Sequence, residues 1–141
     1  MTSLVDQFGR TIEYLRISVT DRCNFRCRYC MPLEGLPWLP KSDILSYEEI
    51  REVVAQLAPM GLRRIRLTGG EPTIRPQLET LVRFIRDVSV VVDVARSTTG
   101  MGLPELAGRP AAGVQDRVNN SAPAPCADPI CAVDPCHLRL V

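Results

Sequence analysis

The sequence predicts an α/β fold in which helices pack against a parallel sheet. Segments with the alternating or β-branched pattern of strands take turns along the chain with segments whose apolar residues recur at helical spacing. This order requires crossover connections, which place successive strands parallel and curl the sheet toward an open sheet or part of a barrel. Functional side chains are then expected in the loops that follow the carboxyl ends of the strands.

The first half of the chain contains the clearest elements. Residues 14–20 alternate as a strand and lead into a polar loop with three cysteines. Ser46 and Glu49 form a capping-box pattern at the start of a helix, which Gly61 ends. Residues 64–68 predict the next strand, which a Gly-Gly-Glu-Pro turn joins to a second helix. The apolar face of the first helix is Ile50, Val53, Val54 and Leu57, and that of the second is Leu78, Leu81, Val82 and Ile85.

The second half has weaker patterns. The β-branched residues 88–94 predict a third strand, residues 103–112 a short helix, and residues 114–118 a fourth strand. After the fourth strand, repeated prolines interrupt any periodicity. We therefore expect one domain over residues 1–121 and an irregular or disordered tail over residues 122–141.

Composition narrows the classes of partner. The 17 basic and 16 acidic side chains leave a net charge of +1, which argues against nucleic acid and against an anionic membrane surface as partners. No apolar run approaches the roughly 18 residues of a membrane span, and no basic region leads into an apolar one at the N-terminus. We expect a cytoplasmic protein whose six cysteines are reduced and serve a metal or a reaction.

Three clustered cysteines are the strongest functional signal. Cys23, Cys27 and Cys30 follow the spacing C-x3-C-x2-C, which lets one loop present three thiolates to an iron–sulfur cluster or zinc. Three ligands for a four-iron cluster leave one iron open to bind and reduce a small molecule. Structural zinc needs a fourth ligand, for which His137 is a distant candidate. Thiol–disulfide chemistry at Cys27 and Cys30 would leave Cys23 unexplained.

This loop, with an aromatic residue before its last cysteine and a Gly-Gly-Glu-Pro turn after the next strand, resembles the radical S-adenosylmethionine (SAM) superfamily. Within it, residues 14–32 and 64–72 resemble the GTP 3′,8-cyclase family of molybdenum cofactor biosynthesis. The resemblance is close over residues 6–87, patchy over residues 97–121 and absent beyond. It implies the N-terminal part of a partial (β/α)6 barrel of TIM type, and it suggests a homodimer.

The resemblance also implies a reaction. A [4Fe-4S] cluster would pass an electron to SAM and cleave it to methionine and a 5′-deoxyadenosyl radical. That radical would take the ribose 3′ hydrogen of GTP, whose sugar carbon then attacks guanine C8 to give 3′,8-cyclo-7,8-dihydro-GTP. Such a lyase needs GTP, SAM and a reductant for the cluster. The alternatives are another radical SAM reaction, such as glycyl-radical activation or peptide modification, and a non-catalytic remnant that binds a cluster.

Site residues follow from the same resemblance. It implies cluster ligation by Cys23, Cys27 and Cys30, SAM binding by Tyr29, Gly70 and Ser121, and GTP binding by Arg16, Arg66 and Ser97. Taken alone, Arg16 and Arg66 would be solvated charges at strand ends, but guanidinium groups suit the phosphate oxygens of GTP. Glu71 would either accept a hydrogen bond from the ligand's amino group or solvate its turn.

Several features depart from the family. Its enzymes are expected to be much longer and to carry further barrel strands, a second cluster and a terminal Gly-Gly. The spacing of Cys126, Cys131 and Cys136 does not match that second cluster. Arg96 is expected to end an otherwise apolar strand. We therefore expect a truncated or frameshifted product whose core is incompletely covered. Ligation of a cluster by the three tail cysteines is the less favoured alternative.

Overall fold

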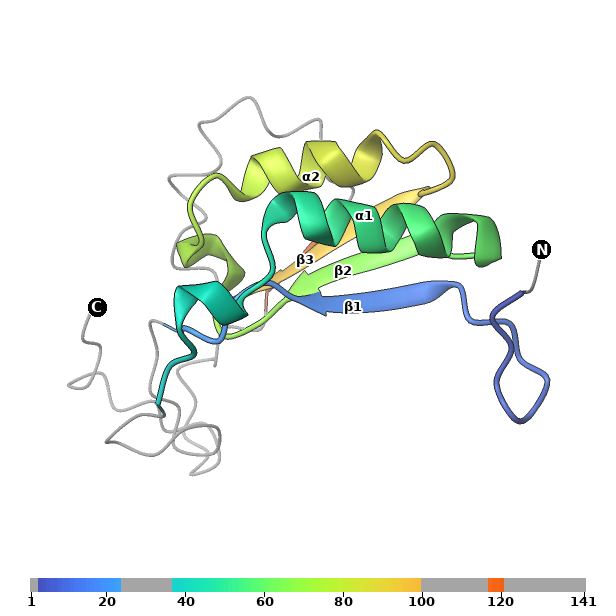
Figure 1. Cartoon of the computed structure of the whole chain (residues 1–141), viewed down its shortest axis with the longest axis horizontal. Helices are drawn as coiled ribbons and strands as arrows, with labels where there is room; N and C mark the ends of the chain where they lie inside the picture. The colour runs from blue at the N-terminus through green and yellow to red at the C-terminus, as the bar shows by residue number, and fades with distance from the viewer. Residues whose placement is uncertain (1–2, 24–36, 100–116, 121–141) are drawn as a thin grey trace.

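The structure, a computed structural model, describes residues 3–23, 37–99 and 117–120, the last of these as backbone only. Its four strands form one sheet in the order β1-β2-β3-β4, with every neighbouring pair parallel. The strands are β1 (Tyr14–Ser18), β2 (Arg64–Thr68), β3 (Asp93–Thr98) and β4 (Arg117–Asn120), and the two helices are α1 (Tyr47–Leu57) and α2 (Leu78–Arg86). Both helices lie on the same side of the sheet (Figure 1). The predicted α/β class is confirmed, and sequential parallel strands are the arrangement of part of a TIM-like barrel.

The capping box predicted for the first helix is present. The Ser46 hydroxyl accepts a hydrogen bond from the Glu49 backbone N–H at 3.1 Å, and the Ser46 N–H donates to the Glu49 carboxylate at 2.7 Å. α1 then runs to Leu57 and continues as a short 3₁₀ turn. Gly61 follows with a φ of 110°, a left-handed conformation that favours glycine and turns the chain toward β2.

One hydrophobic core fills the space between the sheet and the two helices. Its buried members include Ile50 and Val54 of α1, Leu78, Leu81, Val82 and Ile85 of α2, and Ile65, Leu67 and Val94 of the sheet. Successive strand residues point to opposite faces, so the residues between these apolar positions face away from the helices. The sheet therefore has a core face and a second face on which polar side chains can meet a ligand.

The third strand begins later than the sequence predicts. Residues 88–94 contain many β-branched residues, but the Val88 N–H donates to the Ile85 carbonyl at 3.1 Å and the Val91 N–H to the Val88 carbonyl at 3.0 Å. These hydrogen bonds make a turn that leads from α2 into β3, so β-propensity was a poor guide to the boundary. Arg96, expected at the end of this strand, lies inside it and is only 6% exposed.

The predictions for the second half of the chain concern a fourth strand, a short helix and an irregular tail, and the structure describes only part of these residues. β4 pairs with β3 and overlaps the predicted strand 114–118 at residues 117 and 118, while residues 114–116 lie outside the described residues. The predicted helix 103–112 and the predicted tail 122–141 lie outside the described residues, as do Cys126, Cys131, Cys136 and His137. In the described parts of the chain, no helix has the length and apolar character needed to cross a membrane.

Candidate functional site

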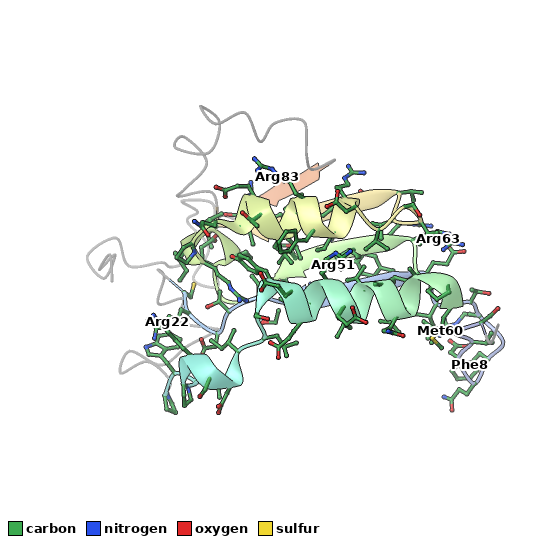
Figure 2. The ribbon with its side chains drawn as sticks, turned by 45° about the horizontal axis from the view of Figure 1, so that its top comes forward. Phe8, Arg22, Arg51, Met60, Arg63 and Arg83 are labelled. Atoms are coloured by element: carbon green, nitrogen blue, oxygen red, sulfur yellow. The ribbon has the colours of Figure 1, made fainter. Side chains whose placement is uncertain are left out.

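The carboxyl ends of β1, β2 and β3 meet at one edge of the sheet, and the loops after them carry the candidate site. β1 leads toward the cysteines, and β2 leads into the Gly69–Pro72 turn. Figure 2 shows Arg22, at the start of the cysteine segment, at the opposite end of the molecule from Phe8 and Met60. The location agrees with the rule that parallel strands place chemistry at their carboxyl ends.

The turn after β2 is hydrogen-bonded to the segment that leads into the cysteines. The Gly70 N–H donates to the Thr20 carbonyl at 2.9 Å, and the Glu71 N–H donates to the Arg22 carbonyl at 2.8 Å. These bonds extend the pairing of β1 with β2 beyond the end of the sheet. They place Cys23, the residue after Arg22, next to the Gly-Gly turn.

Two glycines permit this close approach. A methyl group added to Gly69 would overlap the backbone of Thr20, and one added to Gly70 would overlap the carbonyl group of Arg22. Gly69 also has a φ of 148°. The glycine pair is therefore required by the packing of one backbone on another, and it leaves the turn without side chains that would block a ligand.

Cys23 is the one predicted cluster ligand among the described residues, and its side chain is partly buried. The other two ligands, Cys27 and Cys30, lie outside the described residues, as do the predicted SAM contacts Tyr29 and Ser121. A thiol at this edge, beside the glycine pair, fits the first ligand of an iron–sulfur cluster, since thiolates are the ligands such clusters use. Within the described ranges, no three His, Cys, Asp or Glu side chains are grouped as a metal site.

Glu71 joins the loops after β2 and β3, a role that the sequence did not indicate. Its side chain is fully buried, so the expectation that it solvates the turn is wrong. One carboxylate oxygen accepts hydrogen bonds from the Thr73 N–H (3.1 Å) and hydroxyl (2.5 Å) and from the Thr98 hydroxyl (2.7 Å). The other accepts from the Thr99 N–H and hydroxyl, both at 2.7 Å.

These hydrogen bonds keep the Glu71 carboxylate ionised. Burial by itself would raise its pKa, because a charged group is less stable away from water. The hydrogen bonds from Thr73, Thr99 and Thr98 favour the charged form and outweigh burial, so the pKa of Glu71 is lowered. A carboxylate with five donors is an acceptor-only group that fixes two loops relative to each other.

Arg75 contacts the chain on both sides of the cysteines and was also missed. Its Nη1 donates to the Val19 carbonyl at 2.7 Å, and its Nη2 donates to the Leu45 carbonyl at 2.6 Å. The guanidinium carbon lies 4.3 Å from the centroid of the Tyr47 ring. An arginine shortly after the Gly-Gly-Glu-Pro turn was the only signal in the sequence, and it does not predict these partners.

The predicted GTP contacts lie together on the face of the sheet opposite the helices. Arg16 of β1 and Arg66 of β2 are direct cross-strand partners, and Ala95 of β3 is the next partner in the same row. Ser97 lies two residues beyond Ala95 and so shares their face. The Arg66 guanidinium carbon is 5.7 Å from the centroid of the Tyr14 ring. Two adjacent guanidinium groups create a positive potential that favours an anion.

Arg96 places a further positive charge in the interior of β3. Burial lowers its pKa, and the negative charges of Glu71 and Glu79 oppose that change. Its Nε atom has no hydrogen-bond partner among the described residues.

Comparison with known proteins agrees with this geometry. The family model of the radical SAM superfamily matches residues 17–125. The chain belongs to the radical SAM superfamily. The matched residues include the cysteine motif, the Gly-Gly-Glu-Pro turn and all strands from β2 to β4.

Curated relatives of this radical SAM chain are GTP 3′,8-cyclases. It is 47% identical over 118 residues to the enzyme of Campylobacter curvus, and the aligned residues make up 84% of this chain and 37% of the relative. It is 45% identical over 118 residues to the enzyme of Heliobacterium modesticaldum, with 84% and 36% covered. It is 53% identical over 102 residues to the enzyme of Pelotomaculum thermopropionicum, with 72% and 31% covered. The radical SAM chain thus spans about a third of the length of the curated relatives it matches.

Proposed function

We propose that this chain carries the cluster and SAM site of an enzyme that cyclises GTP to 3′,8-cyclo-7,8-dihydro-GTP in molybdenum cofactor biosynthesis. The observation that carries the proposal is the packing of the Gly69–Gly70 turn against the backbone that leads into Cys23. It supports a common site for a thiolate-bound cluster and a small ligand at one sheet edge. The similarity to GTP 3′,8-cyclases supports the choice of reaction.

The cluster and SAM would be held by two sets of residues. Cys23, Cys27 and Cys30 would provide thiolates to a [4Fe-4S] cluster, which when bound supplies the electron that cleaves SAM. Gly70 would offer SAM the backbone of its turn, whose packing against Arg22 requires glycine at this position. Tyr29 and Ser121 would complete the SAM site.

GTP would bind on the face of the sheet opposite the helices. Arg16 and Arg66 would meet phosphate oxygens with paired hydrogen bonds, and Ser97 would provide a hydroxyl nearby. The ring of Tyr14 supports Arg66 from one side, which restricts where the guanidinium can point. We place the enzyme in the cytoplasm, as a homodimer that needs an external reductant and has neither nucleic acid nor membrane as a partner.

Anaerobic reconstitution tests the first half of this proposal. The full chain would be supplied with iron and sulfide and examined, when reduced, by electron paramagnetic resonance with and without SAM. We expect a four-iron signal that shifts when SAM is added. Cys23→Ser should abolish it, whereas the matched control Cys126→Ser should keep it. A wild-type chain without a cluster, or with a signal indifferent to SAM, would contradict the proposal.

Binding of GTP separates this reaction from other radical SAM reactions. We expect anaerobic calorimetry to detect GTP binding by the reconstituted chain. A cluster that responds to SAM in a chain that binds no GTP would instead support another radical SAM reaction, such as glycyl-radical activation or peptide modification. Turnover would then be measured with GTP and the reductant, either on this chain alone or together with the remaining part of a full-length relative.

A further inference from the structure

We propose that Arg75 is a positioning residue that holds together the two ends of the cysteine loop, defined as residues 22–38. The inference rests on the proposed function, because it concerns how the chain prepares its cluster site. Arg75 follows the Gly-Gly-Glu-Pro turn and touches the chain before and after that loop. It would act on the cysteines through the backbone, since its hydrogen bonds within the described residues go to the carbonyls of Val19 and Leu45.

Arg75 binds one carbonyl group on each side of the cysteine loop. Val19 precedes the cysteine loop and Leu45 follows it, and the two nitrogens of one guanidinium donate to their carbonyls at 2.7 and 2.6 Å. Hydrogen bonds from an ionised donor are roughly twice as strong as neutral ones. One rigid planar group thus fixes the separation between the two ends of the loop.

The guanidinium is itself held in place. It packs on the ring of Tyr47 at 4.3 Å, and the Tyr47 hydroxyl donates to the Pro76 carbonyl at 2.7 Å. Tyr47 is the first residue of α1, so this contact connects Arg75 to the helix that covers the sheet. A lysine could not reproduce the arrangement, because its single ammonium group cannot present two parallel donors and stack on a ring.

A second contact closes the same loop nearer to the cysteines. The Leu39 N–H donates to the Asp21 carboxylate at 2.6 Å, and Asp21 lies two residues before Cys23. The loop is therefore closed by Asp21 and Leu39 and, outside them, by Arg75. Bringing the ends of a loop together costs conformational entropy. These contacts offset part of that cost in the apoprotein, before any iron binds.

The test compares Arg75→Met, Arg75→Lys and a control, Arg51→Met, in the full chain. Arg51 is an exposed residue of α1 (Figure 2), so its substitution removes the same charge without touching the loop. Hydrogen exchange of the Leu39 amide is measured in the apoprotein. We expect Arg75→Met to speed this exchange by about tenfold or more, Arg75→Lys to give an intermediate rate, and Arg51→Met to match wild type.

Cluster assembly is the second readout. We expect Arg75→Met to take up iron more slowly than Arg51→Met and to give a more heterogeneous paramagnetic signal with SAM. Equal exchange at Leu39 and equal assembly in these two variants would overturn the inference. Arg75→Met could also unfold the core, which would appear as lost protection at core amides such as that of Leu81. In that case Arg75→Lys becomes the deciding variant, and exchange at Leu39 equal to that of wild type would overturn the inference.

The two proposals fail in different ways. A wild-type chain that assembles no four-iron cluster contradicts the proposed function, whereas the exchange of Leu39 in the apoprotein still decides the role of Arg75. A wild-type chain that assembles the cluster, together with an Arg75→Met variant that does so at the same rate, contradicts only the positioning role.

Discussion

The buried carboxylate of Glu71 accepts a hydrogen bond from the hydroxyl of Thr98 at 2.7 Å and so connects the turn after β2 to the end of β3. Together with the bonds from Thr73 and Thr99, this contact makes one ionised side chain the common acceptor of two loops at the candidate site. Because Glu71 directly follows Gly70, this network lies next to the Gly-Gly turn.

Replacing Glu71 with glutamine should destabilise the fold. The amide keeps the size of the side chain but removes the charge and turns one acceptor into a donor that faces N–H and O–H groups. We expect the free energy of unfolding to fall by about 2 kcal/mol or more, since a buried polar group left without a partner costs about 1–3 kcal/mol. Urea unfolding measures the change. The control Glu48→Gln, at the exposed start of α1, should cost less than about 1 kcal/mol, and equal costs would refute the structural role.

Acid should weaken the folded state partly through Glu71. Its pKa is lowered from the usual 4.5, so its contribution to stability is fully present above that value and is lost as the pH falls through the lower pKa of the folded state. Unfolding measured at a series of pH values should show this loss in wild type. The Glu71→Gln variant, which has no group to titrate there, should show a smaller acid dependence. Parallel pH profiles of the two proteins would contradict the assignment.

Gly70→Ala should disturb the site through steric overlap. The added methyl group would meet the Arg22 carbonyl, so we expect a loss of about 1–3 kcal/mol in stability and a weaker effect of SAM on the cluster signal. Gly9→Ala is the control, because Gly9 has a φ of 78° but nothing within 4 Å of the added carbon. It should cost about 1 kcal/mol from backbone strain and leave the response to SAM unchanged. A normal SAM response in Gly70→Ala would count against the turn as part of the SAM site.

Arg16→Ala and Arg66→Ala should each weaken GTP binding by about tenfold or more with little change in stability, because both side chains lie on the face away from the core. Arg64→Ala is a matched control, since Arg64 lies on the same strand and face, nearer the amino end, and pairs with Glu13 at 3.4 Å. Anaerobic calorimetry gives the affinities. A similar loss of affinity in all three variants would indicate a diffuse effect of charge.

Local patterns predicted the first half of the fold well. The Ser46–Glu49 capping box and the strand Arg64–Thr68 are present as expected, because both depend on neighbouring residues. The start of β3 was misplaced because the β-branched residues before it form the turn out of α2, and composition does not separate a turn of valines from a strand. That error also hid the burial of Arg96 inside the strand.

At the site, the sequence identified residue types better than contacts. The structure makes Arg16 and Arg66 cross-strand partners and places Gly69 and Gly70 in a tight turn, while the binding roles of these residues stay predictions. The bond of Glu71 with Thr99 and that of Arg75 with Val19 could not be predicted, because these partners lie 28 and 56 residues away. The Val19 partner is a backbone carbonyl, which carries no sequence signal. Contacts between residues so far apart in the sequence can be assigned only once the order of the strands in the sheet is known.

The placement of both helices on one face of the sheet has a consequence for how such a chain can evolve. Substitutions among residues such as Leu67 and Val94 are restricted by the core, whereas those at Arg16, Arg66 and Ser97 lie on the other face and leave the core unchanged. Under the proposed function, selection could therefore alter the preferred substrate on one face while the other preserves foldability. A shared framework of this kind allows related enzymes to diverge in chemistry without first acquiring new stability.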